Sequence, residues 1–468
     1  MKVLHVLANS SPDVNGYAVR TQMLLQYQNK LDGVENIGLT SPWYPDRDSM
    51  VEEHQLENVQ YLRTIHPSRR AKNRKISHKL VSLFTRKPTA INLKIKNAPE
   101  KKKIFPLRVF DFFYYGFFKI GRACRHFFRI GWKVVEENIL VREFTRRIVV
   151  VAGEENVDCI HAHTPYRVGL PALKAARKLD LPFVYEMRGM WEETAVANGR
   201  WMRNGPAYKR FQAHETRVLR KADAVICISE TLRKEAISRG VLPAKITVVP
   251  NAIETAIFEN EIISEALPSA VERLNTDSEP TVIGYIGSLR EMEGVDLTAD
   301  AVALLHNKGH NVRLFVLTGT NGQAALRQHC KLLGIEDITV IMGPVPHSEV
   351  SGFYDLIDLF VVSRPDTRVT RLVTPLKPFE AMAMKKPVIA SRLPALEEIV
   401  QHDKTGFLFQ PGQKEDLALT LERCLKDPHF CIQIGANAKK WVVENRTWER
   451  VVESTMTAYK QAGLEARS

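Results

Sequence analysis

The sequence predicts an α/β protein with two parallel-sheet domains, and two observations support this. Short, almost continuously apolar runs, such as residues 157–162 and 282–287, alternate with longer segments of helical periodicity. Strands buried on both faces have this composition, and strands alternating with helices form parallel sheets with right-handed crossovers. The alternation breaks at residues 262–280, which are rich in proline and short polar residues and are typical of a linker with a loose helix. We therefore expect two large domains that meet between residues 251 and 280.

The first predicted domain covers residues 1–250. It begins with a strand at Val3–Ala8, followed by a turn and a helix whose apolar residues recur every four positions from Val19 to Leu31. Its remaining strands are expected at residues 157–162, 182–186, 224–229 and 246–250. Each strand is separated from the next by a charged helical stretch, so the sheet is expected to be parallel.

The second predicted domain covers residues 251–440 and repeats this plan. Its strands are expected at residues 282–287, 312–318, 339–342, 359–363, 388–391 and 406–409. Residues 441–468 follow as a single amphipathic helix with Thr447 as its N-cap and no strand after it. The apolar positions of this helix are Trp448, Val452, Met456 and Tyr459.

Residues 66–150 are predicted to be a basic, aromatic-rich insertion in the first domain. The chain as a whole has 66 Lys and Arg against 53 Asp and Glu, a formal net charge of +13. Between Arg69 and Val135, 19 Lys or Arg face only two acidic residues, and eleven aromatic residues lie between Phe105 and Trp132. A cationic, aromatic segment too polar to span a membrane fits a helix in a membrane interface. The alternative is a helical flap that covers the first domain; nucleic-acid binding is disfavoured because no known nucleic-acid motif accompanies the charge.

Composition also limits compartment and cofactor. The six cysteines are scattered without C-x-x-C or zinc spacing, so neither a disulfide framework nor structural zinc is expected. The apolar run after Lys2 is too short for a signal peptide, and no window is long enough for a membrane span. Gly16 follows the first strand without a G-x-G-x-x-G pattern, which argues against a dinucleotide-dependent oxidoreductase. The expected location is a reducing cytosol.

Two histidines, His161 and His163, follow the strand at residues 157–160. At the carboxyl end of a parallel strand a side chain faces the crevice in which ligands bind. His163 lies further out of the strand and is the better functional candidate. The alternative, that both histidines are structural, carries equal weight.

The densest group of chemically capable residues lies between Ser363 and Ser391. A buried strand ends at Ser363 and is followed by a cationic loop that two prolines stiffen, and Pro378 suits the first turn of a helix. Main-chain N–H groups at the helix start, together with Lys377, would stabilise a diphosphate without a metal ion. Glu380, in the first turn, would accept hydrogen bonds from a vicinal diol such as ribose. An ordinary crossover with a solvated charged loop is the alternative.

The order of these motifs resembles glycosyltransferase family 4, whose members are retaining nucleotide-sugar enzymes. The resemblance implies two facing Rossmann-like domains of the GT-B type, and it covers nearly all of the chain outside residues 66–150. The run Thr374-Pro375-Leu376-Lys377-Pro378 is most similar to members associated with bacterial exopolysaccharide and exosortase gene clusters. The pieces that match are residues 4–7 with Gly16, 161–163, 185–189, 222–225 with 228–229, 249–252, 285–288, 343–346, 354–358 and 378–383.

The resemblance implies roles for individual residues. His163 would contact the donor sugar and Gly16 would let the first-domain loop reach the sugar or diphosphate, while Glu380 matches the second glutamate of the family's pair, which binds ribose. The helix around Trp448 would cross back onto the first domain. Sugar and phosphate would be held by Thr374, Pro375, Leu376 and Lys377.

The chain departs from the family in three places. Ser288 and Glu293 stand where the family usually has Arg and Lys, and Arg371-Leu372 stands where the first glutamate of the pair should fall. Phosphate charge must therefore be met by other cations, which are Arg290, Arg364, Arg368, Arg371 and Lys377. The D-x-D pattern of metal-dependent sugar transferases occurs at residues 46–48, but no buried strand precedes it, and we expect a solvated loop and no metal.

The resulting hypothesis is a metal-independent, retaining, hexosyltransferase-like enzyme with His163 and Lys377 as catalytic residues. It would move a sugar from a UDP- or GDP-type donor to a polysaccharide or lipid-linked acceptor, in the cytoplasm or at the inner face of the membrane. Two alternatives stay open: a non-catalytic nucleotide-sugar-binding scaffold of a membrane glycan assembly, and a sugar-nucleotide epimerase. Donor hydrolysis without acceptor separates the enzyme from the scaffold. The donor sugar, base, acceptor and oligomeric state are not determined by the sequence.

Overall fold

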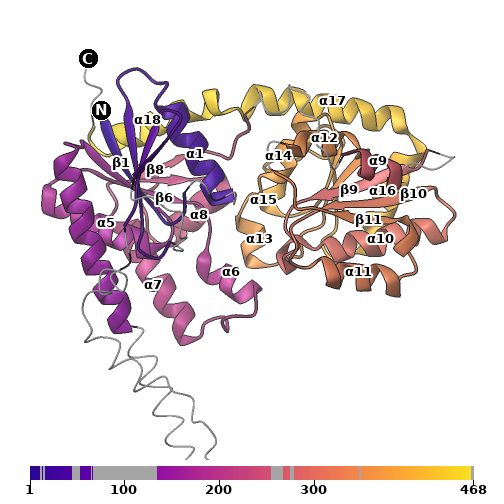
Figure 1. The fold of residues 1–468 in the computed structure, drawn as a ribbon, viewed down its shortest axis with the longest axis horizontal. Helices are drawn as coiled ribbons and strands as arrows, with labels where there is room; N and C mark the ends of the chain where they lie inside the picture. The colour runs from indigo at the N-terminus through magenta and orange to yellow at the C-terminus, as the bar shows by residue number, and fades with distance from the viewer. Residues whose placement is uncertain are drawn as a thin grey trace, which may run out of the picture.

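The computed structural model describes residues 1–10, 13, 16–44, 53–64, 66, 134–254, 267–274, 279–346 and 349–464. The basic and aromatic stretch from Arg69 to Trp132, and the D-x-D pattern at residues 46–48, lie outside the described residues. The described chain forms two α/β domains, each a sheet with helices on both faces (Figure 1). The predicted fold class, two parallel-sheet domains, is confirmed.

The first domain is built on an eight-stranded sheet of order β3-β4-β2-β1-β5-β6-β7-β8. All of its strand pairs are parallel except β3 with β4. The strands are β1 (Lys2–Leu7), β2 (Glu35–Thr40), β3 (Glu53–Leu56), β4 (Val59–Leu62), β5 (Cys159–His163), β6 (Phe183–Met187), β7 (Ala224–Cys227) and β8 (Ile246–Val248). The five predicted strands coincide with β1 and β5–β8, whereas β2–β4 were not predicted. In the β1–β5 register His5 pairs with His161, so the histidines of neighbouring strands are brought together.

Helices cover both faces of this first sheet. They are α1 (Gly16–Gln28), a helix at residues 134–154, α5 (Tyr166–Leu179), α6 (Trp191–Ala197), α7 (Pro206–Lys221) and α8 (Glu230–Ser238). Ser229 caps α8 by accepting a hydrogen bond from the N–H of Leu232. The sheet therefore presents the carboxyl ends of β1, β5, β6 and β7 beside the N-termini of α1, α5 and α8.

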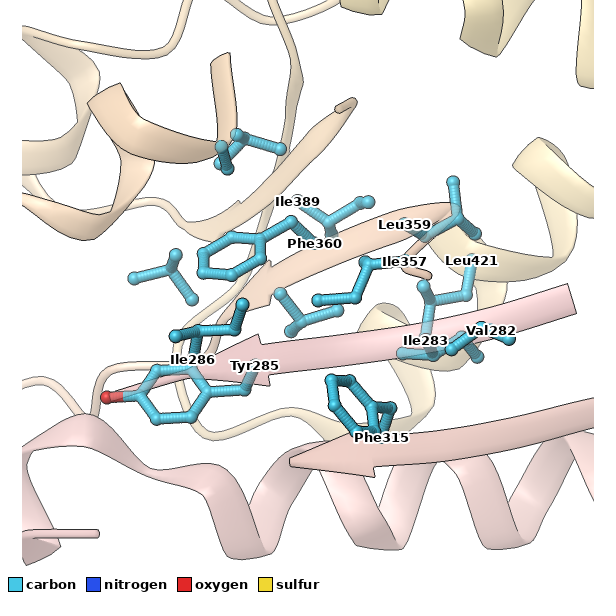
Figure 2. Close-up of a cluster of buried hydrophobic side chains, with 14 of the residues drawn as sticks. Val282, Ile283, Tyr285, Ile286, Phe315, Ile357, Leu359, Phe360, Ile389 and Leu421 are labelled. Atoms are coloured by element: carbon cyan, nitrogen blue, oxygen red, sulfur yellow. The ribbon is translucent and has the colours of Figure 1, made fainter. Parts of the chain in front are cut away.

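The second domain is built on a six-stranded sheet of order β11-β10-β9-β12-β13-β14, in which every pair is parallel. All six predicted strands are present, as β9 (Thr281–Ile286), β10 (Val312–Leu317), β11 (Thr339–Met342), β12 (Leu359–Val362), β13 (Val388–Ser391) and β14 (Phe407–Phe409). Figure 2 shows the core beside β9 and β12, where Ile283, Phe360 and Ile357 pack closely. A side chain at Gly284 would come within 2.4 Å of Ile357, so β9 needs a glycine at this position.

Helices also flank the second sheet, and two long ones close the fold. The flanking helices are α9 (Leu267–Leu274), α10 (Val295–Asn307), α11 (Gln323–Leu332), α12 (Val350–Asp355), α13 (Arg368–Leu372), α14 (Lys377–Ala383), α15 (Pro394–Glu397) and α16 (Lys414–Lys426). The long helix α17 (Pro428–Asn445) runs along this domain, and α18 (Trp448–Gln461) returns to the first (Figure 1). Trp448 is buried with Leu24 and Leu25 of α1, and Tyr459 packs near β5 and β7. No helix in the described ranges combines the length and the apolar composition of a membrane span.

Candidate functional site

The two domains meet where the strands of both sheets end, and we call this contact the interdomain seam. It is formed by α6, α8, Gly16 and Asn251 from the first domain and by residues 363–376 and α15 from the second. The Asn251 side-chain amide donates to the main-chain oxygen of Thr374 at 3.1 Å. A Cβ at Gly16 would lie 3.6 Å from Leu376 Cδ1, so these two predicted donor-site residues face each other across the seam. Ligands of open α/β sheets bind in this position.

On the first-domain side, a buried charged cluster lies where β5 and β6 end. Glu186 is at its centre and is fully buried. Arg20 from α1 donates to Glu186 Oε1 through Nε at 3.0 Å and Nη2 at 2.7 Å, while Arg188 Nη2 donates to Oε2 at 2.9 Å. His163 Nδ1 lies 2.6 Å from the same Oε2. Burial alone would raise the pKa of Glu186, but Arg188 and Arg20 hold it well below its usual range. We call Arg20, His163, Glu186 and Arg188 the Glu186 cluster.

The hydrogen bonds around His5 fix the ring nitrogens of His163. The Asn36 side-chain amide donates to Asn29 Oδ1 at 2.7 Å, which turns Asn36 Oδ1 toward His5 Nε2 at 2.9 Å. His5 must therefore carry its proton on Nε2 and accept at Nδ1, where His163 Nε2 lies 2.9 Å away. The other nitrogen of His163 is in contact with Glu186 and with Arg188. Both nitrogens of His163 are thus engaged within the protein.

The electrostatics keep His163 neutral. Its ring is buried, and burial followed by the nearby Arg188 guanidinium lowers the pKa of His163 to about 4, although Glu186 acts in the opposite direction. Burial likewise lowers the pKa values of His5 and His161 well below the usual range. A neutral, doubly hydrogen-bonded imidazole is suited to fixing the shape of the site rather than to transferring a proton.

Three buried histidines, His5, His161 and His163, have ring nitrogens within 4.8 Å of one another, which is compatible with a metal site. Nε2 of His161 is buried and has no hydrogen-bond partner among the described residues. However, Arg188 Nη2 lies 2.6 Å from His163 Nδ1, and the adjoining Glu186 cluster already holds two guanidinium groups against one carboxylate. A dication here would add charge to a cationic interior, so the electrostatics disfavour a metal ion.

On the second-domain side, the loop after β12 leads through α13 to the start of α14. Thr367 and Thr370 form a capping box at α13, and Pro378 lies in the first turn of α14, as its sequence position predicts. Lys377, the first residue of α14, is half-buried and forms no ion pair with any described residue. Its Cε would lie 3.1 Å from a Cβ at Gly287, so a glycine at the end of β9 allows the lysine to pass. Lys377 is therefore held at the seam with its charge unbalanced.

Glu380 lies one turn further along α14 and is buried. Its Oε2 accepts a hydrogen bond from the Tyr354 hydroxyl at 2.8 Å. Within the described part of the chain its other oxygen has no partner. That oxygen is available to a hydroxyl-bearing ligand.

The four arginines predicted to meet phosphate charge are all ion-paired. Glu293 binds Arg364 through both of its oxygens and also accepts from Arg290, and these guanidinium groups lower its pKa against the effect of burial. Arg371 pairs with Asp366 of its own loop. Arg368 reaches across the seam to Glu193 and Glu235 of the first domain. Of the five predicted cations, Lys377 is the one whose charge no described residue balances.

Comparisons with known proteins agree with this architecture. The family described as Glycosyl transferases group 1 matches residues 269–441, and the family described as Glycosyltransferase Family 4 matches residues 105–257. The chain belongs to the family 4 glycosyltransferases. Among curated relatives, an uncharacterized glycosyltransferase of Methanocaldococcus jannaschii is 25% identical over 315 residues, which is 67% of this chain and 77% of that protein. The capsular polysaccharide biosynthesis glycosyltransferase CapM of Staphylococcus aureus is 24% identical over 326 residues, 68% of this chain and 81% of that one.

Solved structures share the fold over nearly the whole length. Sucrose-phosphate synthase from Thermosynechococcus elongatus superposes with a TM-score of 0.68 at 15% identity and covers 98% of each chain. HepE of Anabaena, solved in complex with UDP and glucose, superposes with a TM-score of 0.64 at 16% identity, covering 99% of this chain and 100% of its own. At such identities the likeness establishes the GT-B fold of this glycosyltransferase.

The sequence reasoning assigned no role to Arg20, His5 or Arg188, although they surround His163 in this glycosyltransferase. One signal was present: Glu186 and His5 are polar residues inside apolar strand-like runs, and a charge in such a run must find a buried partner. Of the other predicted donor residues, Thr374 and Pro375 are buried at the seam, whereas Ser288 is exposed and its main-chain oxygen accepts from the Tyr285 hydroxyl.

Proposed function

We propose that this glycosyltransferase moves a sugar from a UDP- or GDP-type donor to a polysaccharide or lipid-linked acceptor, with retention at the anomeric carbon, in bacterial cell-surface or exopolysaccharide synthesis. The observation that carries the proposal is the unbalanced charge of Lys377 at the start of α14, one turn from the free oxygen of Glu380. A diphosphate and a ribose diol, joined in one nucleotide, would occupy both groups. The names of two similar proteins agree, since CapM serves capsular polysaccharide and HepE was solved with UDP and glucose.

In the proposed mechanism, the leaving diphosphate is stabilised by Lys377 and by the main-chain N–H groups at the start of α14. A metal ion is not required, because these fixed positive groups supply the stabilisation that a dication would otherwise give. Glu380 orients the ribose, and Gly16, which faces Leu376 across the seam, would let the first-domain loop reach the sugar or diphosphate. The main chain of Thr374 and the closely packed Pro375 complete the donor wall. Reaction then depends mainly on positioning and on charge stabilisation in a closed site.

The Glu186 cluster would support the sugar side of the site. His163 would contact the donor sugar with a ring whose orientation is fixed by His5 at Nε2 and by Arg188 at Nδ1. Glu186 itself is fully buried, and Arg20 and Arg188 engage its two oxygens, which argues against its acting as a nucleophile. This supports retention without a covalent glycosyl-enzyme intermediate.

The decisive test is a calorimetric binding screen of UDP, GDP and ADP, followed by the sugars of whichever nucleotide binds. We expect one nucleoside diphosphate to bind, to lose affinity in Lys377→Ala, and to be released from its sugar when an acceptor is added. Mass spectrometry of the product and NMR of its anomeric proton would establish transfer and retention. If no nucleotide binds, or if binding is unchanged in Lys377→Ala, the proposed site is wrong.

The second candidate is a nucleotide-sugar-binding scaffold without catalysis. It is favoured by Glu293, which takes up the charge of Arg364 and Arg290 beside the proposed diphosphate position. Slow hydrolysis of the donor without acceptor separates the two functions. An enzyme releases free sugar, whereas a scaffold binds the donor and leaves it intact.

We further propose that residues 69–132 bring the enzyme to the inner face of the cytoplasmic membrane, where lipid-linked acceptors lie. The support is the sequence, in which basic and aromatic residues are concentrated in this stretch. Flotation with anionic vesicles at low salt tests the idea. The full chain should float and a variant lacking residues 69–132 should not, while both bind the same nucleotide; a full chain that fails to float would contradict it.

A further inference from the structure

Arg368 is the first residue of α13, in the second domain, but its ion-pair partners belong to the first. Its Nε lies 3.0 Å from Glu193 Oε1, and its Nη2 donates to both oxygens of Glu235 at 2.8 Å. Glu193 lies on α6 and Glu235 on α8. A cation that the sequence suggested for phosphate binding is therefore engaged as a contact between domains.

The first domain has a local need for this cation. Three buried carboxylates, Glu192, Glu193 and Glu235, lie on α6 and α8. Their own domain provides Arg239, which pairs with Glu192 and Glu235, and the half-exposed Arg203, which pairs with Glu193. Arg368 supplies the third positive charge. Separation of the domains would leave buried negative charge without full compensation, which is costly.

A second contact holds the same helix from its N-terminal end. Glu398, which follows α15 in the second domain, accepts hydrogen bonds from the N–H groups of Glu230 and Thr231 at 2.9 and 2.7 Å. These are the first two residues of α8 and their N–H groups have no partner within the helix. A carboxylate at a helix N-terminus also interacts favourably with the helix dipole. Helix α8 is thus bound by the second domain at two points, by Glu398 at its N-terminus and by Arg368 at Glu235.

Between these two contacts runs the segment that leads to Lys377. Three successive main-chain oxygens in it are fixed by hydrogen bonds. Leu372 O accepts from the hydroxyls of Ser229 and Thr231, Val373 O accepts from Arg364, and Thr374 O accepts from Asn251. The hydrogen-bond donors to two of these three oxygens belong to the first domain. The position of the segment therefore depends on contact between the domains.

We propose that Arg368 and Glu398 form an interdomain latch on α8 that positions residues 372–377 for the donor. They are positioning residues and do not bind the donor themselves. The effect on catalysis rests on the proposed function, whereas the effect on domain spacing does not. If the contacts of either residue are broken, the domains can separate. The segment before Lys377 then loses its hydrogen bonds to the first domain.

Domain spacing can be measured without any substrate by single-molecule FRET between dyes at Leu242→Cys and Leu332→Cys. Both positions are well exposed, one in each domain, and Cys124 would be replaced by serine. The other five cysteines are buried. We compare the parent with Arg368→Gln, Glu398→Gln and the matched control Arg371→Gln. The control residue lies on the same short helix but pairs with Asp366 of its own domain.

We expect Arg368→Gln and Glu398→Gln each to shift the population toward lower transfer efficiency, Arg368→Lys to shift it less, and Arg371→Gln to match the parent. Unchanged distributions in both Arg368→Gln and Glu398→Gln, or an equal shift in Arg371→Gln, would overturn the latch. If one variant fails to fold, as judged by its thermal melt, the other still decides.

Kinetics add the catalytic half of the test. Once the donor is identified, we expect Arg368→Gln to raise the donor KM about tenfold. At saturating donor most of kcat should return, because bound donor also holds the two domains together. If Arg368→Gln changes the domain spacing but the parent protein turns over no donor, the latch is supported and the proposed function is wrong. Full activity in Arg368→Gln together with parental spacing would remove the latch alone.

Discussion

The two sides of the interdomain seam handle buried charge in opposite ways. In the Glu186 cluster each charged group of the first domain has its partner, and burial is nearly complete. Across the seam, the described residues leave the half-buried Lys377 without an ion pair and one oxygen of Glu380 without a partner. Desolvated charges that are fully paired maintain a shape, whereas one left unpaired at a domain boundary has a ligand as its natural partner. We therefore propose that the first side maintains the shape of the site and that the second side binds the ligand.

The largest expected effect is a loss of stability on removing the buried charge of Glu186. Glu186→Gln leaves Arg20 and Arg188 buried without their counter-charge, and we expect it to lower the free energy of unfolding by about 3–5 kcal/mol. Because the pKa of Glu186 is depressed in the folded state, its contribution is present above the pKa of the unfolded chain and is lost as the pH falls below it. Urea unfolding at pH 7 measures the change.

The matched control for that experiment is Glu143→Gln, which removes an exposed ion pair with Arg146. It should change the free energy of unfolding by less than about 0.5 kcal/mol. If Glu186→Gln proved equally harmless, the paired side would not be the scaffold that its burial indicates.

Removing the unpaired charge of Lys377 should affect turnover strongly and stability only slightly. Lys377→Ala should reduce kcat about 100-fold, typical of losing one group that stabilises developing charge, while the free energy of unfolding changes by less than about 1 kcal/mol. Lys385→Asn, at the opposite end of α14, is the control, because asparagine tolerates the positive φ of 59° there. A Lys377→Ala enzyme with unchanged turnover would show that this lysine does not meet the leaving group.

Much of the fold could be predicted because the signals were local. Apolar runs gave five strands of the first sheet and all six of the second, and Pro378 marked the start of α14 correctly. Strands β2–β4 were missed because polar residues interrupt the apolar ones in β2 (ENIGLT) and β3 (EHQL), and because β4 (VQYL) is only four residues long. The family resemblance was recognised for the same reason, since its motifs are short and contiguous.

The site was harder to predict, because charge pairing is not local. Arg364 and Arg368 looked like phosphate ligands in a cationic loop. Their partners Glu293 and Glu235 lie 71 and 133 residues away in the sequence, and only tertiary structure brings them together. His163 was chosen because it was predicted near the end of a buried strand, and it is the last residue of β5; its role toward the donor stays a prediction. The hydrogen bond between its Nε2 and His5 connects residues 158 apart in the sequence.

A smaller, pH-dependent effect should come from Glu215, a buried carboxylate on α7 that accepts hydrogen bonds from the Tyr166 N–H and the Tyr185 hydroxyl. Burial raises the pKa of Glu215 to about 7, and Glu192 adds to this, although the Tyr185 hydroxyl donates a hydrogen bond that opposes it. Folding therefore favours the protonated acid, so its contribution to stability is present below the unfolded pKa and is lost as the pH rises through about 7. Glu215→Gln should be neutral near pH 5 and more stable than the parent by about 1–3 kcal/mol at pH 8.5.

Thermal melts of both proteins from pH 5 to pH 8.5 would follow this difference. The parent should lose melting temperature relative to Glu215→Gln as the pH increases. A constant difference across that range would mean that Glu215 ionises normally and that its neighbourhood is more hydrated than its burial suggests.

The smallest effect is expected from Arg290→Ala, because this arginine is ion-paired but largely exposed. Its side chain is 51% exposed and shares Glu293 with the buried Arg364. Because Arg364 alone can satisfy both oxygens of Glu293, Arg290→Ala should change the free energy of unfolding by less than about 1 kcal/mol. An exposed cation in the loop after β9 can still attract a diphosphate, so donor KM should rise a few-fold in Arg290→Ala at low salt. The difference should disappear near 1 M salt, where the Debye length is about 3 Å. A salt-independent increase would instead make Arg290 a direct ligand of the donor and would extend the binding surface from α14 to the end of β9.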